Sequence, residues 1–248
     1  ALPIFWRLDS PRTENGGSIV RSPTPGDEMF VTAWVKDARG NPIAGAEVDI
    51  WHSSTEGLYE NQDPTQADMN LRGKFTSDKD GKISFRSILP AGYPIPITGP
   101  VGDLLRAQGR HNMRPAHLHF LIFKEGFKTH ISQVYVPQDP NIETDVQFGV
   151  TKRLLGDYVR HENEKPPAPG VKDPWFSLDY TFIMEPGVAR LPRAKAPMAR
   201  SISWAGMPGP LSLKLIESPP VAERVAEIST RPPLGVNLMA FDRILMMI

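Results

Sequence analysis

The sequence of 248 residues contains no cysteine. This absence excludes thiolate metal sites, disulfide frameworks and a cysteine nucleophile. The sequence also lacks any run of about 18 apolar residues, which a membrane-spanning helix requires. Its N-terminus lacks the order of basic, apolar and small residues that marks a signal peptide. We therefore expect a soluble protein without a membrane span, and we take the cytoplasm as its default compartment.

The chain has no excess charge of either sign, because 28 lysines and arginines balance 28 acidic residues. A chain without a net positive field lacks electrostatic support for binding nucleic acid or an anionic membrane surface. We therefore expect neither partner. A small neutral or weakly anionic molecule fits this composition better.

Proline and glycine are frequent, with 26 and 20 residues, and they separate short β-prone runs. This pattern is typical of a β-sandwich whose strands are joined by turns. The expected strands are 30–35, 45–51, 74–76, 83–85, 117–123, 131–136 and 180–184, with 74–76 and 83–85 paired as a hairpin around the Asp78–Gly81 turn. Leucine pairs predict short helices at 101–108 and 151–161. The fold class is therefore all-β, a sandwich with a few short helices and an irregular C-terminal tail.

The composition changes near Leu191, after which prolines recur without a period. We expect a catalytic domain over residues 1–190 and an atypical, poorly ordered extension over 191–248, with a short helix at 220–228. The chain begins at Ala1 instead of Met, which we interpret as a truncated start.

Two histidines lie two residues apart, His117 and His119, on an expected strand. The pleat of a strand directs both imidazoles to one face, which suits two neighbouring positions on one metal ion. The same spacing occurs in cupins and by chance, and two packed histidines bonded to backbone remain an alternative. A site with two histidines and one carboxylate needs an acid shortly downstream, but Glu125 belongs to a turn.

Two tyrosines occupy unusual, turn-rich positions, Tyr59 after Glu56-Gly57-Leu58 and Tyr93 within Pro90-Ala91-Gly92-Tyr93-Pro94. Each could be an ordinary packing residue, since tyrosine is amphipathic. A phenol loses its proton near pH 10, so a tyrosinate ligand at neutral pH demands a strongly Lewis-acidic ion. Ferric iron is the biological candidate.

Several motifs, spanning roughly residues 4–186, resemble those of the intradiol ring-cleaving dioxygenases and occur in that family's order. They are Val48-Asp49-Ile50-Trp51-His52, Gly57-Leu58-Tyr59, Asn70 to Phe75, Phe85-Arg86-Ser87-Ile88, Gly92-Tyr93-Pro94, Gly109-Arg110-His111 and Arg114 to Phe120. The resemblance implies one iron(III) per chain, and it implies four metal ligands, Tyr59, Tyr93, His117 and His119. It places Arg114 and Gln133 against the bound substrate.

The resemblance also implies a mechanism in which the diol binds iron(III) as a chelating dianion and O2 opens the ring to a dicarboxylate. In the family the second tyrosine, here Tyr93, leaves the metal and acts as a base. Arg114 is a permanent cation suited to stabilising negative charge on the ring, and Gln133 would orient the same intermediate. Alternatively, Arg114 caps a loop or pairs with an acid, and Gln133 is solvated.

The strings 57–64 and 93–96 resemble hydroxyquinol 1,2-dioxygenases more than catechol or chlorocatechol 1,2-dioxygenases. The implied substrates are hydroxyquinol and O2, and the implied product is 3-hydroxy-cis,cis-muconate, the tautomer of maleylacetate. Chlorinated hydroxyquinols, catechol and chlorocatechols stay open, because one ring substituent is worth only about 1 to 3 kcal/mol. The family is homodimeric through a helical N-terminal segment that is mostly absent before Ala1, which leaves dimerisation of this chain open.

An alternative of another class is a non-catalytic, prealbumin-like sandwich module, which the segments 40–46 and 78–81 also resemble. Such a module has no reason to keep two histidines together with two loop tyrosines. Among the remaining histidines, His111 is expected to brace the loop before the metal strand. We interpret His52, His130 and His161 as surface or packing residues.

Overall fold

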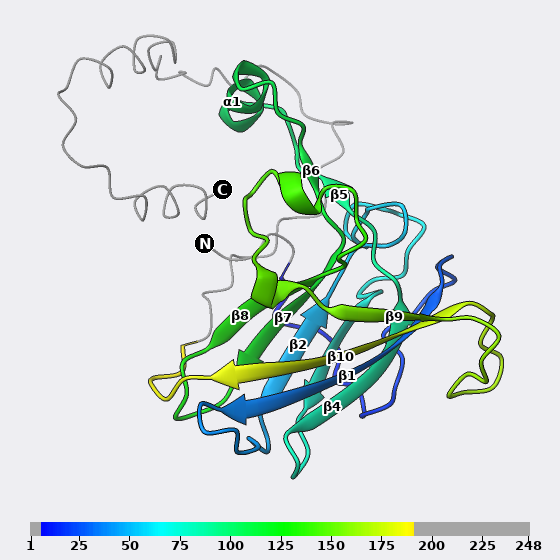
Figure 1. The fold of residues 1–248 in the computed structure, drawn as a ribbon, viewed down its shortest axis with the longest axis vertical. Coiled ribbons are helices and arrows are strands. Elements are labelled where there is room, and N and C mark those ends of the chain that lie inside the picture. The colour runs from blue at the N-terminus through cyan, green and yellow to red at the C-terminus, as the bar shows by residue number, and fades with distance from the viewer. Residues whose placement is uncertain (1–5, 191–248) are drawn as a thin grey trace, which may run out of the picture. The chain divides into compact units, whose positions relative to one another are not determined.

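The computed structural model describes residues 6–190 (Figure 1). The strands are β1 Glu28–Asp37, β2 Glu47–Trp51, β3 Arg72–Thr76, β4 Lys82–Ile88, β5 Tyr93–Pro94, β6 Met113–Arg114, β7 His117–Phe123, β8 His130–Tyr135, β9 Asp157–His161 and β10 Trp175–Met184. The helices are α1 Pro100–Ala107 and two 3₁₀ turns, η1 Ile142–Thr144 and η2 Lys152–Leu154. No helix in this part of the chain has the length and apolar character that crossing a bilayer requires.

Two four-stranded sheets form the molecule, in the orders β4-β1-β10-β9 and β3-β2-β7-β8, and β5 and β6 form a small ribbon beside them. Strands β1 and β10 are parallel, and the other neighbours are antiparallel. The sheets share one apolar core, which Val31 from the first sheet and Val48 and Phe120 from the second help to fill. The all-β sandwich expected from the sequence is confirmed.

Alternation along the strands builds this core. In β1 every second residue is buried, namely Met29, Val31, Ala33 and Val35. Burying an aliphatic side chain of this size contributes about 1.5 to 3 kcal/mol, so the stripe stabilises the pairing of β1 within its sheet. The helix expected at 101–108 is also present as α1.

Two local predictions are wrong. The Asp78–Gly81 turn exists, since Asp78 accepts from the backbone N–H of Lys82, but it does not join a hairpin. Strand β3 pairs with β2 and β4 pairs with β1, so the turn carries the chain from one sheet to the other. The helix expected at 151–161 is replaced by η2 and β9, because β9 adds to the edge of β10 and buries Tyr158.

The predicted poorly ordered extension at 191–248 and the predicted helix at 220–228 lie outside the described residues. Residues 6–190 belong to one compact unit. A domain boundary near residue 190 therefore stays a prediction.

Strand β7 of the second sheet is buried on both faces, and its outer face positions the site. Along β7, Leu118, Phe120 and Ile122 face the shared core. The alternate residues His117, His119 and Leu121 are also buried. A second apolar cluster covers this face and consists of Trp51, Tyr59, Tyr93 and Leu121, with Trp6, Ile95 and Phe123 packed against it.

Candidate active site

His117 and His119 project from the same face of β7, as the spacing predicts. Their Nε2 atoms lie 3.0 Å apart. The Nδ1 atom of His117 lies 2.7 Å from the carbonyl oxygen of Pro115. A carbonyl only accepts, so Nδ1 of His117 carries the proton and its Nε2 presents a lone pair. The ring of His119 is stacked on Trp51 of the neighbouring strand β2, which fixes its plane.

Both imidazoles are neutral at ordinary pH. Burial, followed by the positive charge of Arg114, holds the pKa of His117 well below its usual value. Burial, His117 and Arg114 do the same to the pKa of His119. A histidine must be unprotonated to bind a metal, so this environment prepares both side chains for ligation.

Tyr59 and Tyr93 adjoin the histidine pair from two other segments of the chain. The ring centroid of Tyr93 is 5.4 Å from that of His117, and the two tyrosine rings are also 5.4 Å apart. Tyr59 lies 6.5 Å from His119, measured between ring centroids. Burial, the proximity of Tyr93 and hydrogen bonding with Tyr93 raise the pKa of Tyr59. The four side chains therefore converge on one buried point.

Glycines permit the two tyrosine segments to approach each other. Gly57 has φ of 71°, a left-handed conformation that favours glycine, and a Cβ on it would lie 2.8 Å from the carbonyl oxygen of Gly92. Tyr93 itself lies opposite Arg114 in the β5–β6 ribbon. The Gly-Leu-Tyr motif thus owes its glycine to this close contact, whereas a Cβ on Gly92 of the Gly-Tyr-Pro motif would lie 2.6 Å from the carbonyl oxygen of Arg114.

The arrangement fits a metal ion. Two nitrogen ligands about 2.1 Å from one ion and about 90° apart would lie about 3.0 Å from each other, as the two Nε2 atoms do. Among residues 6–190, no three His, Cys, Asp or Glu side chains are grouped as a metal site. Three phenols adjoin the histidine pair, and that of Tyr135 is already hydrogen-bonded to Arg114 and Gln133. The phenols of Tyr59 and Tyr93 are therefore the oxygen donors that suit a hard, strongly Lewis-acidic ion.

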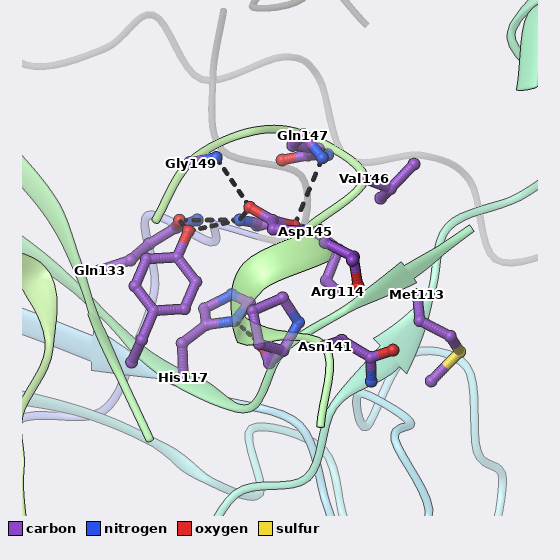
Figure 2. Close-up of polar contacts among 12 residues, drawn as sticks. Met113, Arg114, His117, Gln133, Asn141, Asp145, Val146, Gln147 and Gly149 are labelled. Carbon is purple, nitrogen blue, oxygen red and sulfur yellow. Dashed lines mark hydrogen bonds and ion pairs between the residues drawn. The ribbon is translucent and has the colours of Figure 1, made fainter. Parts of the chain in front are cut away.

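Arg114 is buried beside this point and pairs with an acid, Asp145 (Figure 2). Its Nε lies 3.2 Å from Oδ1 of Asp145, and its Nη2 lies 3.0 Å from Oε1 of Gln133. Burial opposes the charge, but Tyr135, Tyr93 and Asp145 together raise the pKa of Arg114. Arg114 therefore pairs with an acid, and its contact with bound substrate stays a prediction.

Gln133 is half-buried on β8 and faces the histidines. Its Nε2 lies 3.4 Å from Nδ1 of His119. His111 lies as expected in the preceding loop, where its Nε2 is 2.8 Å from Oγ1 of Thr144. His52 is a packing residue, because it is buried between the carbonyl oxygen of Ser53 and the hydroxyl of Ser87.

Sequence reasoning missed three residues of the site, Trp51, Tyr135 and Asp145. Tyr135 alternates with Gln133 on one strand, which was an available signal. Trp51 lies within a motif that carried the family resemblance. No local pattern marks Asp145, because its role depends on a loop returning to Arg114.

Known proteins resemble this chain over the described region. The family described as "Dioxygenase" matches residues 4–185. The hydroxyquinol 1,2-dioxygenase of Rhizobium sp. (strain MTP-10005) is 42% identical over 186 residues, 74% of this chain and 63% of that protein. The catechol 1,2-dioxygenase of Candida albicans is 36% identical over 185 residues, 74% of this chain and 60% of that protein.

A solved hydroxyquinol 1,2-dioxygenase, from Pseudomonas putida DLL-E4, superposes with a TM-score of 0.68 and 34% identity, covering 75% of this chain and 65% of that chain. The chain thus spans less than two thirds of the length of each of these relatives. The family match and these likenesses confirm the family expected from the sequence motifs. The chain belongs to the dioxygenase family, in its intradiol ring-cleaving branch.

Proposed function

We propose that the protein opens the ring of hydroxyquinol (benzene-1,2,4-triol), or of a related catechol, between its two adjacent hydroxylated carbons. Both atoms of O2 enter the product, 3-hydroxy-cis,cis-muconate, which is the tautomer of maleylacetate, in aromatic compound catabolism. The observation that carries the proposal is the convergence of two neutral histidines and two tyrosines beside a buried arginine. The 42% identity to a hydroxyquinol 1,2-dioxygenase supports the choice of substrate.

One iron(III) per chain would be held by Tyr59, Tyr93, His117 and His119. When bound, iron(III) supplies the Lewis acidity that ionises the diol and makes its ring reactive toward O2. The neutral imidazoles and the two phenols match the donors that such an ion prefers. The expected occupant is therefore ferric rather than ferrous iron.

The two tyrosines have different environments, which supports different roles. Tyr59 is 1% exposed, and the guanidinium of Arg72 lies 6.0 Å from its ring centroid. Tyr93 is 8% exposed and lies on a strand of only two residues. We therefore assign Tyr59 as the fixed ligand and Tyr93 as the ligand whose phenolate oxygen would take a proton from the substrate.

Arg114 and Gln133 act on the bound ring. Arg114 keeps its positive charge throughout, so it stabilises negative charge that develops on the ring during oxygen attack. Gln133 reaches the same region from β8 and orients the reacting ring through its amide. Arg114 is buried, which strengthens its charge interaction with the ring.

A visible absorption spectrum tests this function. The 248-residue chain is loaded with iron(III), and spectra are taken with and without hydroxyquinol in the absence of O2. We expect a tyrosinate-to-iron charge-transfer band that shifts when the diol is added, and ring-opened product when O2 is admitted. A protein that stays colourless and consumes no O2 contradicts the assignment, as a non-catalytic sandwich module would.

Catechol is the second candidate substrate, because the Candida albicans relative that is 36% identical carries that name. Comparison of kcat/KM for hydroxyquinol, catechol and 4-chlorocatechol separates the candidates. We expect hydroxyquinol to be preferred. The proposed compartment is the cytoplasm, and the proposed partners are limited to the aromatic diol or triol and O2.

A further inference from the structure

Asp145 lies just after η1, is almost fully buried, and uses both of its carboxylate oxygens within the site (Figure 2). Its Oδ1 accepts from Nε of Arg114 at 3.2 Å and from the backbone N–H of Gln147 at 3.3 Å. Its Oδ2 accepts from Nη2 of Arg114 at 3.3 Å and from the backbone N–H of Gly149 at 2.7 Å. One carboxylate thus ties the guanidinium to the 145–149 loop.

Tyr135 contacts the same guanidinium at Nη2, the nitrogen that also donates to Oδ2 of Asp145. Its hydroxyl oxygen accepts from Nη2 of Arg114 at 2.5 Å, and its hydroxyl donates to Oε1 of Gln133. Strand pairing places Tyr135 directly opposite His117, so the phenol is brought to the site by the register of β8 against β7.

These contacts fix the orientation of the Gln133 amide. Oε1 of Gln133 faces two donors, Nη2 of Arg114 and the hydroxyl of Tyr135. A guanidinium nitrogen only donates, so a flipped amide would place N–H against N–H. The Nε2 end of Gln133 must therefore face Nδ1 of His119, which lies 3.4 Å away.

The same contacts select the free edge of Arg114. Its Nε and Nη2 are both occupied by protein acceptors. Its third nitrogen, Nη1, forms no hydrogen bond with any residue in the described range 6–190. Nη1 is consequently the nitrogen left to bind a ligand.

We propose that Asp145 and Tyr135 are positioning residues that act through Arg114 and Gln133, an inference that rests on the proposed function. Asp145 holds the Nε–Nη2 edge of Arg114, which leaves Nη1 for the substrate. Tyr135 bridges Arg114 to Gln133 and holds the Gln133 amide in one orientation. Neither residue touches the substrate itself.

The test uses Asp145→Asn and Tyr135→Phe in the full chain. Each has a matched control that makes the same change elsewhere in the fold. Tyr158→Phe also removes a buried tyrosine hydroxyl, one that donates to the carbonyl oxygen of Val134. Asp49→Asn also neutralises a buried aspartate, one that accepts from Trp6.

We expect the two site variants to lower kcat for hydroxyquinol by about 10- to 100-fold, because misplacement near 1 Å costs that much. We expect KM to change by less than threefold and the iron charge-transfer band to remain. The controls should keep kcat within twofold of the wild type. The inference is overturned if Asp145→Asn and Tyr135→Phe keep kcat within twofold as well.

A second measurement needs no iron and separates the inference from the proposed function. Selective ¹⁵N labelling of glutamine reports the side-chain amide of Gln133 in the iron-free chain. We expect one sharp pair of amide N–H signals in the wild type, because Oε1 of Gln133 accepts from Arg114 and Tyr135, and a shifted or broadened pair in Tyr135→Phe. An unchanged pair in Tyr135→Phe contradicts the positioning of Gln133. Failure of the wild type to bind iron or turn over refutes the proposed function instead.

Discussion

Trp51 lies face to face with His119, with ring centroids 4.7 Å apart and planes 4° from parallel. The two residues are direct partners across β2 and β7, so strand register creates the stack. We predict that Trp51→Leu lowers iron(III) affinity by about 10- to 100-fold, because groups that orient a metal ligand typically contribute that much. Competition against a ferric chelator measures the change.

Trp175→Leu is the matched control. Trp175 stacks on His161 at 3.8 Å between ring centroids and 10° between planes, but this pair lies at the β9–β10 pairing, away from the site. Both substitutions should destabilise the fold by less than the about 3 to 5 kcal/mol that truncation of a buried tryptophan to alanine costs, because leucine fills part of the space. Equal loss of iron affinity in the two variants would mean that stability, not ring orientation, controls binding.

Loss of the Tyr59 hydroxyl should remove a metal ligand without removing the ring. We predict that Tyr59→Phe loses the charge-transfer band of Tyr59 and binds iron(III) at least about 100-fold more weakly, because one hard oxygen donor is gone. Metal analysis and the visible spectrum measure both effects. Tyr158→Phe, a buried tyrosine outside the site, should keep its iron and its colour. Retention of full colour and affinity in Tyr59→Phe contradicts the ligand set.

The sequence was sufficient to predict residues whose geometry depends on local rules. The face shared by His117 and His119 follows from the pleat of one strand. Tyr135 and Trp51 reach those histidines only through the pairings of β8 and β2 with β7, and short-range pattern does not specify such register. Asp145 depends on the return of an irregular loop, for which no periodicity exists.

The wrongly predicted hairpin at Asp78–Gly81 and the wrongly predicted helix at 151–161 have the same cause, which is pairing with strands distant in the sequence. The residues of the Asp78–Gly81 turn determine a local reversal of the chain. Burial decides which sheet each of the two flanking strands, β3 and β4, joins. The leucines near residue 154 suggested a helix, whereas the open edge of β10 favours a strand at Asp157–His161.

The carboxyl of Asp49 should make stability depend on pH. Burial raises its pKa to about 6, against hydrogen bonds from Ser10 and Trp6 that lower it. The folded chain then binds more protons than the unfolded chain between about pH 4 and 6, so this group's contribution to stability is lost as pH rises through that interval. A pKa shift of this size corresponds to a change of about 3 kcal/mol in the free energy of unfolding.

Asp49→Asn isolates that contribution. We expect the variant and the wild type to be equally stable near pH 4 and the variant to be more stable near pH 7, measured by urea unfolding at each pH. The difference between the two proteins is needed because burial lowers the pKa of His52 to about 4, which gives the opposite slope over the same range. A difference that does not change with pH contradicts the raised pKa.

Gly149 sits where the 145–149 loop crosses the site. A Cβ there would lie 2.6 Å from the hydroxyl oxygen of Tyr135 and 3.1 Å from Nη2 of Arg114. We predict that Gly149→Ala displaces these groups, lowers kcat by about tenfold or more through misorientation, and costs about 1 to 3 kcal/mol of stability from overpacking. Steady-state kinetics and urea unfolding measure the two effects.

Gly40→Ala provides the comparison, because Gly40 has φ of 87° and nothing within 4 Å of a built Cβ. This substitution lowers the stability of the fold through backbone strain alone, by about 1 to 3 kcal/mol. The turn that contains Gly40 lies outside the site. The two alanine variants should therefore lose similar stability while only Gly149→Ala loses kcat. If Gly149→Ala keeps kcat within twofold, the Tyr135 hydroxyl and the Arg114 guanidinium tolerate displacement, and tight packing of this loop is not required for turnover.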